Sequence, residues 1–375
     1  MNNATKVLFA AALAVAMSSA TMASHVCAYV NDNVPGVPGP NAVEGYMIGP
    51  GSATVHVGPY STNGRGIGAG FYSGDLAATR EREGDLYVND PATDNITHFK
   101  INKTDCTLTL DTTLYPAGDT GVEYGDLLAI TPDGRTIFVA STVNFDIYSH
   151  TIAANGSLGA PFTETSLPNR PGGIEVSPDG KTLVISIPGL QVCAYPIWDG
   201  HLGTPNCQST PGYAYGVSID PASTCVYAAE ANDRTSEVAA FTLIGGILGT
   251  ATEYNPFGLG VGSSGILVNW DNTAVYVSEG NSAQITTGAI ASGCRLSYKA
   301  IIRDGVVGSN APGQIAQAKI AHGYLVVGDE KYSGYPTSMG TFRAQANGNI
   351  TPLGSGHFPL MLGGAPLSIV VVGSE

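Results

Sequence analysis

Two stretches of the sequence decide the fold: Leu127–Ala140, which reads LLAITPDGRTIFVA, and Ile174–Ser186, which reads IEVSPDGKTLVIS. Each contains a short apolar run, a Pro-Asp-Gly turn and a second apolar run. Apolar runs of this length, bounded by proline, aspartate and glycine, are typical of buried β-strands joined by tight turns. Each stretch therefore predicts two antiparallel neighbours within one β-sheet.

The same unit recurs along the chain. Weaker copies lie at Val217–Ala228, Ile266–Ser278 and Ile315–Val327, and no long segment has helical periodicity. Each second strand is followed by a third strand and a glycine-containing hairpin. The second strands align on seven positions that lie 43 to 58 residues apart: Tyr29, Tyr87, Phe138, Val184, Tyr227, Tyr276 and Leu325. Seven units of four strands predict an all-β, seven-bladed β-propeller, with an open pair of β-sandwiches as the alternative.

The two ends of the chain predict how the ring closes. The strand Val26–Val30 matches the second strand of a blade but has no innermost strand before it. At the other end, Leu367–Val372 matches an innermost strand but has no second strand after it. Pairing them completes one blade and removes an open sheet edge. We therefore expect a single propeller domain over residues 24–375, closed by its N- and C-terminal strands.

Residues 1–23 have the features of a secretory signal peptide. An apolar run, Val7–Met17, follows a lysine and precedes the small residues Ser18–Ala23. Eleven apolar residues are too few to cross a bilayer, which takes about 20. We expect cleavage after Ala23, or as second choice after Ala20, and a secreted or periplasmic protein without a membrane span.

Composition excludes two classes of partner. The chain has 16 Lys and Arg against 30 Asp and Glu, for a net charge of −14. Removing the signal peptide removes one lysine and no acid, so the net charge becomes −15. Such a chain lacks the basic surface that nucleic acid or an anionic membrane requires. The 49 glycines fit the many tight turns of small blades.

Six cysteines fit an oxidising compartment. Cys193 and Cys207 lie symmetrically about the glycine of one hairpin and are expected to face each other. In the aligned blades, the other four occupy two repeated positions, the start of a second strand and the turn between a third and a fourth. Six cysteines allow 15 pairings. The blade positions predict the disulfides Cys27–Cys106, Cys193–Cys207 and Cys225–Cys294, and no spacing predicts a zinc site.

Candidate functional residues come from the mouth of the channel, where the loops between second and third strands meet those between blades. These loops form an acidic rim with two arginines. The candidate binding residues are Arg65, Glu123, Glu279 and Asp329, and the candidate catalytic residues are Arg170, Glu175 and Glu230. Glu175 interrupts an innermost apolar strand, which also allows a structural role in which it pairs with Arg170 or a channel water.

Three sequence features carry a family resemblance over residues 26–373. They are the repeated Ser/Thr-Pro-Asp-Gly-Lys/Arg turn, the opening pattern Tyr29–Asp32 with Asn41–Val43 and Tyr46, and the glycine-rich Asn63–Gly70. The chain resembles the lactonase-family seven-bladed propellers, which include 6-phosphogluconolactonase-like and carboxymuconate cyclase-like proteins. The resemblance implies a pocket in which His, Glu and Arg activate water and hold the carboxylate of an opened lactone.

On this resemblance, Glu175 or Glu230 would act as the base, and Arg170 or Arg65 would stabilise the oxyanion. The Pro-His pair common in such propellers is replaced here by Arg170–Gly173. Export and the net charge favour an unphosphorylated lactone as substrate. The alternative is a non-catalytic extracytoplasmic propeller that binds a small molecule, polymer or protein at its mouth, and a third hypothesis is a structural or assembly module.

We expect no cofactor. The acidic rim also raises the hypothesis of a Ca²⁺ ion at the channel mouth, because carboxylates and backbone carbonyls converge there, although no linear calcium motif is present. The chain is expected to act as a monomer on a small-molecule or polymer ligand.

Overall fold

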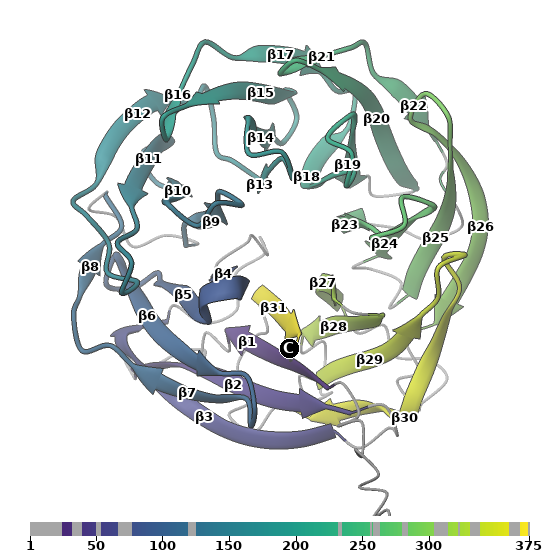
Figure 1. Cartoon of the computed structure of the whole chain (residues 1–375). Helices are drawn as coiled ribbons and strands as arrows, with labels where there is room; N and C mark the ends of the chain where they lie inside the picture. Colours follow the sequence, from purple (N-terminus) through teal and green to yellow (C-terminus); the bar gives the residue numbers. More distant parts are fainter. Residues whose placement is uncertain are drawn as a thin grey trace, which may run out of the picture.

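The computed structural model is a ring of seven antiparallel sheets around a central channel (Figure 1). It describes residues 25–31, 40–49, 54–66, 77–118, 125–231, 235–255, 257, 263–279, 284–303, 314–321, 323–330, 338–359 and 368–373. The predicted seven-bladed propeller is confirmed. The predicted signal peptide lies outside the described residues.

Each sheet is one blade, and the strands follow one another outward from the channel. Blade 1 consists of β31 (Ser368–Gly373), β1 (Val26–Asn31), β2 (Pro40–Ile48) and β3 (Thr54–Arg65). Blade 2 consists of β4 (Ala77–Arg80), the 3₁₀ turn η1 (Glu81–Glu83), β5 (Asp85–Asp90), β6 (Asn95–Asn102), β7 (Thr107–Leu110) and β8 (Tyr115–Pro116). Blade 3 consists of β9 (Leu127–Ile130), β10 (Thr136–Ala140), β11 (Asp146–Thr151) and β12 (Phe162–Ser166).

The remaining blades repeat this plan. Blade 4 consists of β13 (Gly173–Val176), β14 (Thr182–Ile187), β15 (Gln191–Trp198), β16 (His201–Leu202) and β17 (Asn206–Ser209). Blade 5 consists of β18 (Tyr213–Ile219), β19 (Cys225–Ala231), β20 (Ser236–Ile244), β21 (Ile247–Leu248) and β22 (Thr252–Tyr254). Blade 6 consists of β23 (Ser263–Val268), β24 (Ala274–Glu279), β25 (Gln284–Ala291) and β26 (Arg295–Arg303). Blade 7 consists of β27 (Gln314–Ala321), β28 (Tyr324–Glu330), β29 (Ser338–Ala344) and β30 (Ile350–Pro359).

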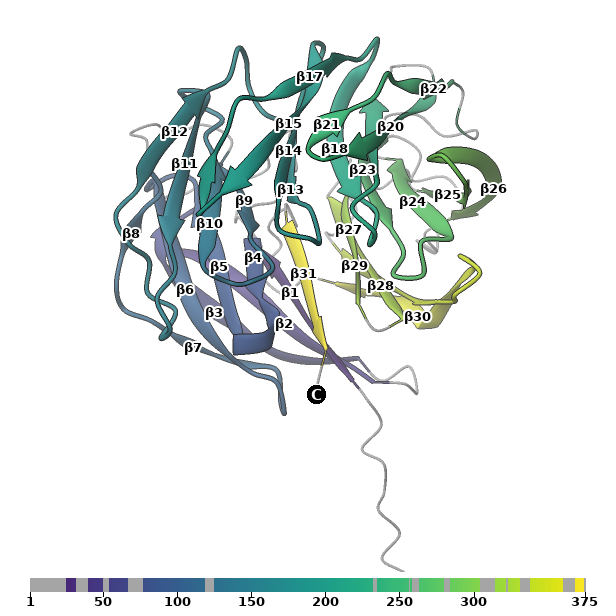
Figure 2. The same cartoon turned by 45° about the horizontal axis from the view of Figure 1, so that its top comes forward.

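Blade 1 is assembled from both ends of the chain, as predicted. β1 pairs with β31 in antiparallel register, with Tyr29 opposite Val370. In Figure 2 the yellow β31 lies beside the purple β1 at the channel. The innermost strands contact one another in sequence around the channel, and β31 contacts both β27 and β4. The ring therefore has no open sheet edge at its junction.

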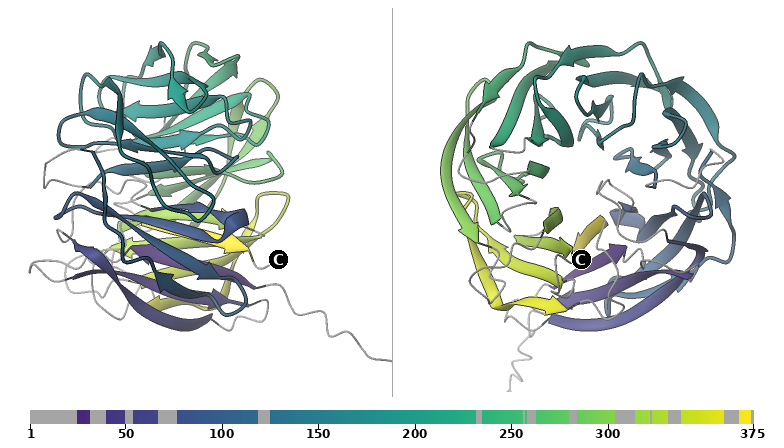
Figure 3. Two further views of the ribbon diagram at one scale, coloured as in Figure 1. Left: turned by 60° about the vertical axis from the view of Figure 1, so that its left-hand side comes forward. Right: turned by 180° about the vertical axis from the view of Figure 1, so that it is seen from behind.

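The core lies between neighbouring blades, which pack face to face around the ring (Figure 3). In the described residues, second strands are buried along almost all of their length because both faces meet another blade, which explains their continuous apolar runs. The aligned aromatic residues Tyr29, Tyr87, Phe138, Tyr227 and Tyr276 are all buried. Each cluster of buried apolar residues spans two adjacent blades.

Three disulfides cross-link the propeller, two between neighbouring blades and one within blade 4. They join Cys27 to Cys106, Cys193 to Cys207, and Cys225 to Cys294, which are the pairs predicted from the blade positions. The first links blades 1 and 2, and the third links blades 5 and 6 in the same way. His25 lies near the first pair, but both thiols are oxidised, so this group offers no metal site. Among the described residues, no helix has the length and apolarity needed to cross a bilayer.

Candidate active site at the mouth of blade 5

A buried carboxyl group occupies the same position in three blades, at the mouth end of the second strand. It is Asp90 in blade 2, Glu230 in blade 5 and Glu279 in blade 6, each three residues after the aligned tyrosine. All three side chains have no measurable solvent exposure. Each lies on the face that packs against the preceding blade. What surrounds the carboxyl group differs from blade to blade.

In blade 2 the position is a closed hydrogen-bonded site. Asp90 accepts hydrogen bonds from Asn95 (3.0 Å) and Thr97 (2.6 Å) of its own blade. It accepts two more from Asn41 (2.8 Å) and Thr62 (2.6 Å) of blade 1. Burial raises the pKa of Asp90 to about 6, although all four donors act to lower it. With its oxygens saturated by donors from two blades, Asp90 acts as a structural link.

Blade 5 lacks most of these donors. The strand registers show which residues replace them: Glu237 stands where Asn95 does and Ala239 where Thr97 does. From the preceding blade, Leu190 replaces Asn41, and Thr210 corresponds to Thr62. Thr210 donates its hydroxyl to the Gly212 carbonyl (3.2 Å). Among the described residues, neither carboxylate oxygen of Glu230 meets a donor in good hydrogen-bond geometry, and its remaining weak partners are the Thr210 hydroxyl and the Glu253 carboxyl group.

Three carboxyl groups lie on neighbouring strands here, and we call Glu230, Glu237 and Glu253 the blade 5 carboxyl cluster. Glu230 lies directly opposite Glu237 on the next strand. An oxygen of each lies 3.1 Å from the position that a Cβ on Gly212 would occupy, so the two oxygens lie within twice that distance of each other. Glu253 lies on the third of three adjacent strands, opposite Ala239, whose methyl group leaves room for it.

The electrostatics of the cluster favour a shared proton. Burial, followed by the charges of Glu253 and Glu237, raises the pKa of Glu230 to about 8. Partial burial and the charge of Glu237 also raise the pKa of Glu253. Glu237 accepts hydrogen bonds from the Thr235 hydroxyl (3.0 Å) and from the amide of Asn255. Pairs of carboxyl groups in such unequal surroundings are the arrangement from which general acids and bases are built.

The mouth around the cluster exposes an aromatic and an aliphatic side chain. Tyr213 is 58% exposed and Leu190 is 42% exposed. A Cβ on Gly189 would lie 3.0 Å from the Tyr213 ring, so the connection from β14 to β15 passes close beside that ring. An exposed tyrosine at a mouth offers a flat surface for a ring-shaped ligand.

Arg170 lies near this end of blades 4 and 5 but shares no hydrogen bond or ion pair with Glu230. Its backbone N–H donates to the Asn169 side chain (2.8 Å), and its own side chain is half-buried. Two residues later, a Cβ on Gly172 would lie 3.0 Å from the carbonyl of Ala214, the residue opposite Glu230. The loop that contains Arg170 therefore packs on β18, the strand that carries Ala214.

Glu175 lies apart from Glu230. It stands opposite Val184, the residue aligned with Tyr227, which places it about 10 Å nearer the opposite end of the channel than Glu230. There it lines a cavity of about 210 Å³ between the innermost strands. Its carboxylate accepts a hydrogen bond from the backbone N–H of Ile219 (3.1 Å), an amide on the inner edge of blade 5. This contact gives Glu175 a structural role between blades.

The other candidate residues are dispersed. Arg65 is exposed at the end of β3, where its N–H donates to Thr93 (3.0 Å). Glu279 is buried beneath the mouth of blade 6, where Ser263 lies 3.5 Å away, and burial raises its pKa. Asp329 belongs to β28, with its side chain outside the described part of the molecule, and Glu123 falls wholly outside it.

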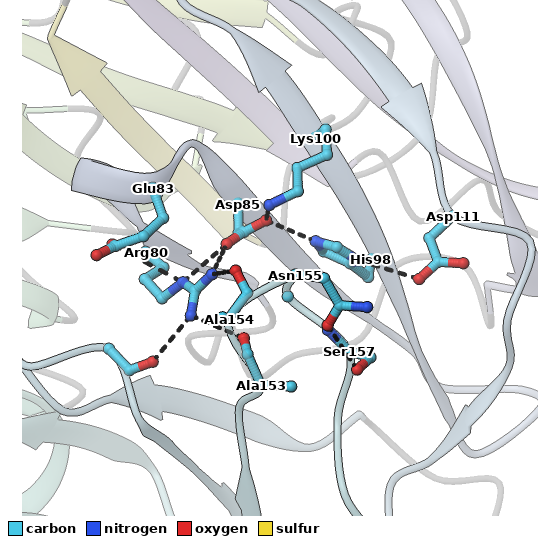
Figure 4. Close-up of polar contacts among 12 residues, drawn as sticks. Arg80, Glu83, Asp85, His98, Lys100, Asp111, Ala153, Ala154, Asn155 and Ser157 are labelled. Carbon is cyan, nitrogen blue, oxygen red and sulfur yellow. Dashed lines mark hydrogen bonds and ion pairs between the residues drawn. The ribbon is translucent and has the colours of Figure 1, made fainter.

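Sequence reasoning missed a charged network at the opposite end of blade 2 (Figure 4). Asp85 is buried and pairs with Arg80 (Nε, 2.7 Å), with Lys100 and with Nε2 of His98 (2.8 Å). The other ring nitrogen of His98 faces Asp111 (3.2 Å). Burial acts to raise the pKa of Asp85, but hydrogen bonds from His98 and Lys100 and the charge of Arg80 outweigh it.

This network is structural. Arg80 also donates to the carbonyls of Gly134 (3.2 Å) and Ala153 (3.1 Å) in blade 3. Each acid of the network is matched by a base, and the contacts join two blades. The sequence does not reveal the network, because its residues lie on β4, β5 and β6 and meet only when these strands pair.

Comparison with known proteins supports the fold. No protein-family model matches the sequence, and no curated protein matches it. Among solved structures, a candidate 6-phosphogluconolactonase from Bacteroides uniformis is 12% identical, with a TM-score of 0.71 over 93% of this chain and 100% of that one. A second candidate 6-phosphogluconolactonase, from Bacteroides fragilis, is 15% identical, with a TM-score of 0.69 over 94% and 99%.

A periplasmic gluconolactonase from Pseudomonas aeruginosa is 14% identical, with a TM-score of 0.66 over 94% of this chain and 99% of the other. The alignments span nearly the whole of each chain, so the likeness extends to all seven blades. The chain has the seven-bladed propeller fold of these lactonase-type proteins.

Proposed function

We propose that this chain is an exported hydrolase of unphosphorylated lactones and that the blade 5 carboxyl cluster supplies its acid and base. The observation that carries the proposal is Glu230, a buried carboxyl group with few hydrogen-bond donors that faces a second carboxylate. The likeness to solved propellers described as lactonases supports the reaction class. Three disulfides support an oxidising, secreted or periplasmic location.

Hydrolysis of a lactone needs a base for the attacking water and an acid for the leaving ring oxygen. In the proposed reaction, Glu237 takes a proton from water as the water oxygen bonds to the carbonyl carbon. The ring C–O bond then breaks, and the leaving oxygen takes the proton held by Glu230. The proton on Glu237 returns to Glu230, so the cluster is restored and the products are a carboxylic acid and an alcohol.

Arg170 is proposed to stabilise the oxyanion and then the product carboxylate. Its loop packs on β18 beside Ala214, the residue opposite Glu230. A guanidinium is suited to this task because it always carries charge and binds a carboxylate through two N–H groups. The net charge of −14 makes an uncharged lactone a better substrate than a phosphorylated one.

The test is acid release from a panel of aldonolactones and aliphatic lactones, measured for the wild type, Glu230→Gln and Arg170→Ala. We expect activity in the wild type, a large loss in Glu230→Gln and a smaller loss in Arg170→Ala. Glu164→Gln is the matched control, because Glu164 is a buried glutamate of blade 3 that is hydrogen-bonded to Ser149 and His201. Wild-type activity in Glu230→Gln would reject the site.

A second function, ligand binding without turnover, is favoured by the exposed Tyr213 and Leu190 at the same mouth. If no lactone is hydrolysed, sugars and aromatic rings are titrated while the tyrosine fluorescence is followed. Saturable binding that Tyr213→Ala abolishes would support this function in place of the first.

A further inference from the structure

We propose that a cavity between blades 3 and 4, at the end of the molecule opposite the mouth, binds a neutral sugar. We call it the turn-side cavity. Its volume is about 630 Å³, which lies within the range of small-molecule sites. Blade 3 lines it with Pro132 and Asp133, and blade 4 with Gly180, Asp199 and Gly200. None of these residues lies at the mouth, so the inference does not depend on lactone hydrolysis.

Two turns and one hairpin form the walls of the turn-side cavity. The Pro-Asp-Gly turns precede β10 and β14, whereas the mouth lies where these strands end. A Cβ on Gly180 would lie 3.5 Å from Pro132 Cδ, so the turn of blade 4 packs on the turn of blade 3. A Cβ on Gly200 would lie 2.6 Å from Thr136 Oγ1, so the hairpin between β15 and β16 reaches the start of β10. Close contacts between blades therefore hold the walls in place.

Thr136 supplies a buried hydroxyl group without a partner. It is 7% exposed, lines the cavity, and directs Oγ1 toward Gly200. Its backbone N–H donates to Thr131 Oγ1 (3.1 Å), and its carbonyl accepts the N–H of Thr131 (3.0 Å). Within the described part of the chain, no hydrogen bond involves Thr136 Oγ1. A buried hydroxyl group that lacks a partner is costly, so Oγ1 points to a ligand that hydrogen-bonds to it.

The aspartates of the two turns leave carboxylate oxygens available to a ligand. Oδ1 of Asp133 accepts hydrogen bonds from the Thr131 hydroxyl (2.6 Å) and from the Arg135 N–H (3.1 Å). Oδ1 of Asp179 is held in the same way within its own turn. Its Oδ2 forms only a 3.8 Å ion pair with the exposed Lys181. Because the turns use Oδ1, the Oδ2 atoms can accept hydrogen bonds from a bound molecule.

The lining favours a neutral, polyhydroxylated ligand. Asp133, Asp179 and Asp199 offer acceptors, whereas the side chains of Arg135 and Thr136 offer donors. A sugar hydroxyl both donates and accepts, so it can use both kinds of group. Three carboxylates against one guanidinium oppose an anion, and the guanidinium opposes a cation. A neutral mono- or disaccharide therefore suits the charge and the volume of the cavity.

The test is calorimetric titration of the mature protein with glucose, maltose and cellobiose, and with gluconate and spermidine as charged probes. We expect saturable binding of one neutral sugar per chain, with a dissociation constant of about 1 mM or below, and no binding of the charged probes. Thr136→Val keeps the shape of the side chain but removes Oγ1, and Asp199→Asn removes a charge. Each should weaken binding about fivefold or more.

Thermal unfolding separates a ligand contact from a structural one. Because Thr136 Oγ1 has no partner in the described chain, Thr136→Val should keep the Tm of the wild type while it loses affinity. A marked fall in Tm would show that Oγ1 serves the fold and would overturn its assignment to a ligand. Asp271→Asn is the matched control, because Asp271 is the exposed acid of the equivalent turn in blade 6, and it should bind as the wild type does.

Tyr213→Ala, at the mouth, distinguishes this site from the one proposed above and should also bind the sugar as the wild type does. Loss of binding in Tyr213→Ala but not in Thr136→Val or Asp199→Asn would place the sugar at the mouth and overturn the proposal. Absence of heat with every neutral sugar at about 50 mM, well above the expected constant, would overturn it too, as would binding of a charged probe in place of the sugars. A chain that binds sugar here without hydrolysing lactones would reject the proposed function and retain this site.

Discussion

Blades 2 and 5 each carry a buried carboxyl group at the same position, but the hydrogen-bond donors around the two groups differ. In blade 2, amides and hydroxyls surround Asp90 with four donors. In blade 5, Glu237, Ala239 and Leu190 replace three of the equivalent residues, and Thr210 alone of the four positions still offers a hydroxyl to Glu230. Blade 2 satisfies the hydrogen-bonding capacity of its carboxylate, whereas blade 5 leaves its carboxyl group able to take part in a reaction.

The comparison shows how a repeated fold makes a site without changing its backbone. Each blade supplies the same strand end, the same approach by a glycine of the preceding blade, and the same burial. Gly64 abuts Asp90, and Gly212 abuts Glu230. The difference is confined to side chains on the neighbouring strands. A reactive carboxyl group therefore results from removal of donors at a position that the fold already buries.

The largest expected effect is on turnover. Glu230→Gln keeps the size of the side chain but removes its ionisable proton, so kcat/KM for the best lactone should fall by about 10²–10⁴. Initial rates of acid release would measure it. Equal rates in this variant and in the wild type would mean that blade 5 is as structural as blade 2.

The second-largest expected effect is on stability, for which the carboxyl group of blade 2 should matter more than that of blade 5. Asp90→Ala removes the acceptor that four buried donors share, which should lower the free energy of unfolding by about 3 kcal/mol or more. Glu230→Ala orphans no donor and should cost less than Asp90→Ala. Denaturant unfolding of both variants checks the order, and a larger loss for Glu230→Ala would contradict the assignment of Asp90 as the link.

A pH dependence should follow from Glu230. Its pKa in the folded state, about 8, lies above the ordinary value of 4.5, so the folded protein holds a proton that the unfolded chain releases between these values. This contribution to stability is present below pH 4.5 and is lost as the pH rises through 8. Glu230→Gln has no such loss.

We therefore expect the Tm of Glu230→Gln to exceed that of the wild type by roughly 2 °C at pH 8, with a smaller difference at pH 5. Thermal unfolding followed by circular dichroism at both values measures it. A difference that is independent of pH would show that the Glu230 proton is not taken up on folding.

The smallest effects concern the two glycines. A Cβ on Gly64 would lie 2.4 Å from the Asp90 Cβ, whereas a Cβ on Gly212 would lie 3.0 Å from the Glu230 Cβ. Gly64→Ala should therefore destabilise the fold more than Gly212→Ala, by about 1–2 kcal/mol. Gly212→Ala should instead reduce activity, since its methyl group enters the space between the Glu230 and Glu237 carboxyl groups. Equal stability losses would contradict the comparison.

The fold could be predicted because its signals are local. The Pro-Asp-Gly turns after Thr131 and Ser177 mark single strand pairs, and repetition of the pattern supplies the number of blades. The disulfides could be predicted because Cys27 and Cys225 occupy equivalent positions in the repeat. In both cases a pattern along the chain reports on contacts that the repeat itself generates.

The candidate site could be predicted only in part. Glu230 follows a second strand, so its place at the mouth was visible in the sequence. The positions of Glu237 and Glu253 beside Glu230 could not be predicted, because they depend on the register of β19, β20 and β22. An alignment of third strands would have paired Asn95, Glu237 and Gln284 and exposed the substitution in blade 5. Glu175 lies at a channel cavity, as expected of an acid in an innermost strand, but it also accepts the Ile219 N–H and lies apart from Glu230.

The pairing of β1 with β31 has a consequence for how the molecule is made. β1 is synthesised well before its inner partner, Ser368–Gly373. Blade 1 must wait for synthesis of β31, while blades 2 to 6 can form in order. The Cys27–Cys106 bond can secure the waiting strand to blade 2 beforehand. Loss of this disulfide should therefore slow maturation more than loss of Cys193–Cys207, which lies within one blade.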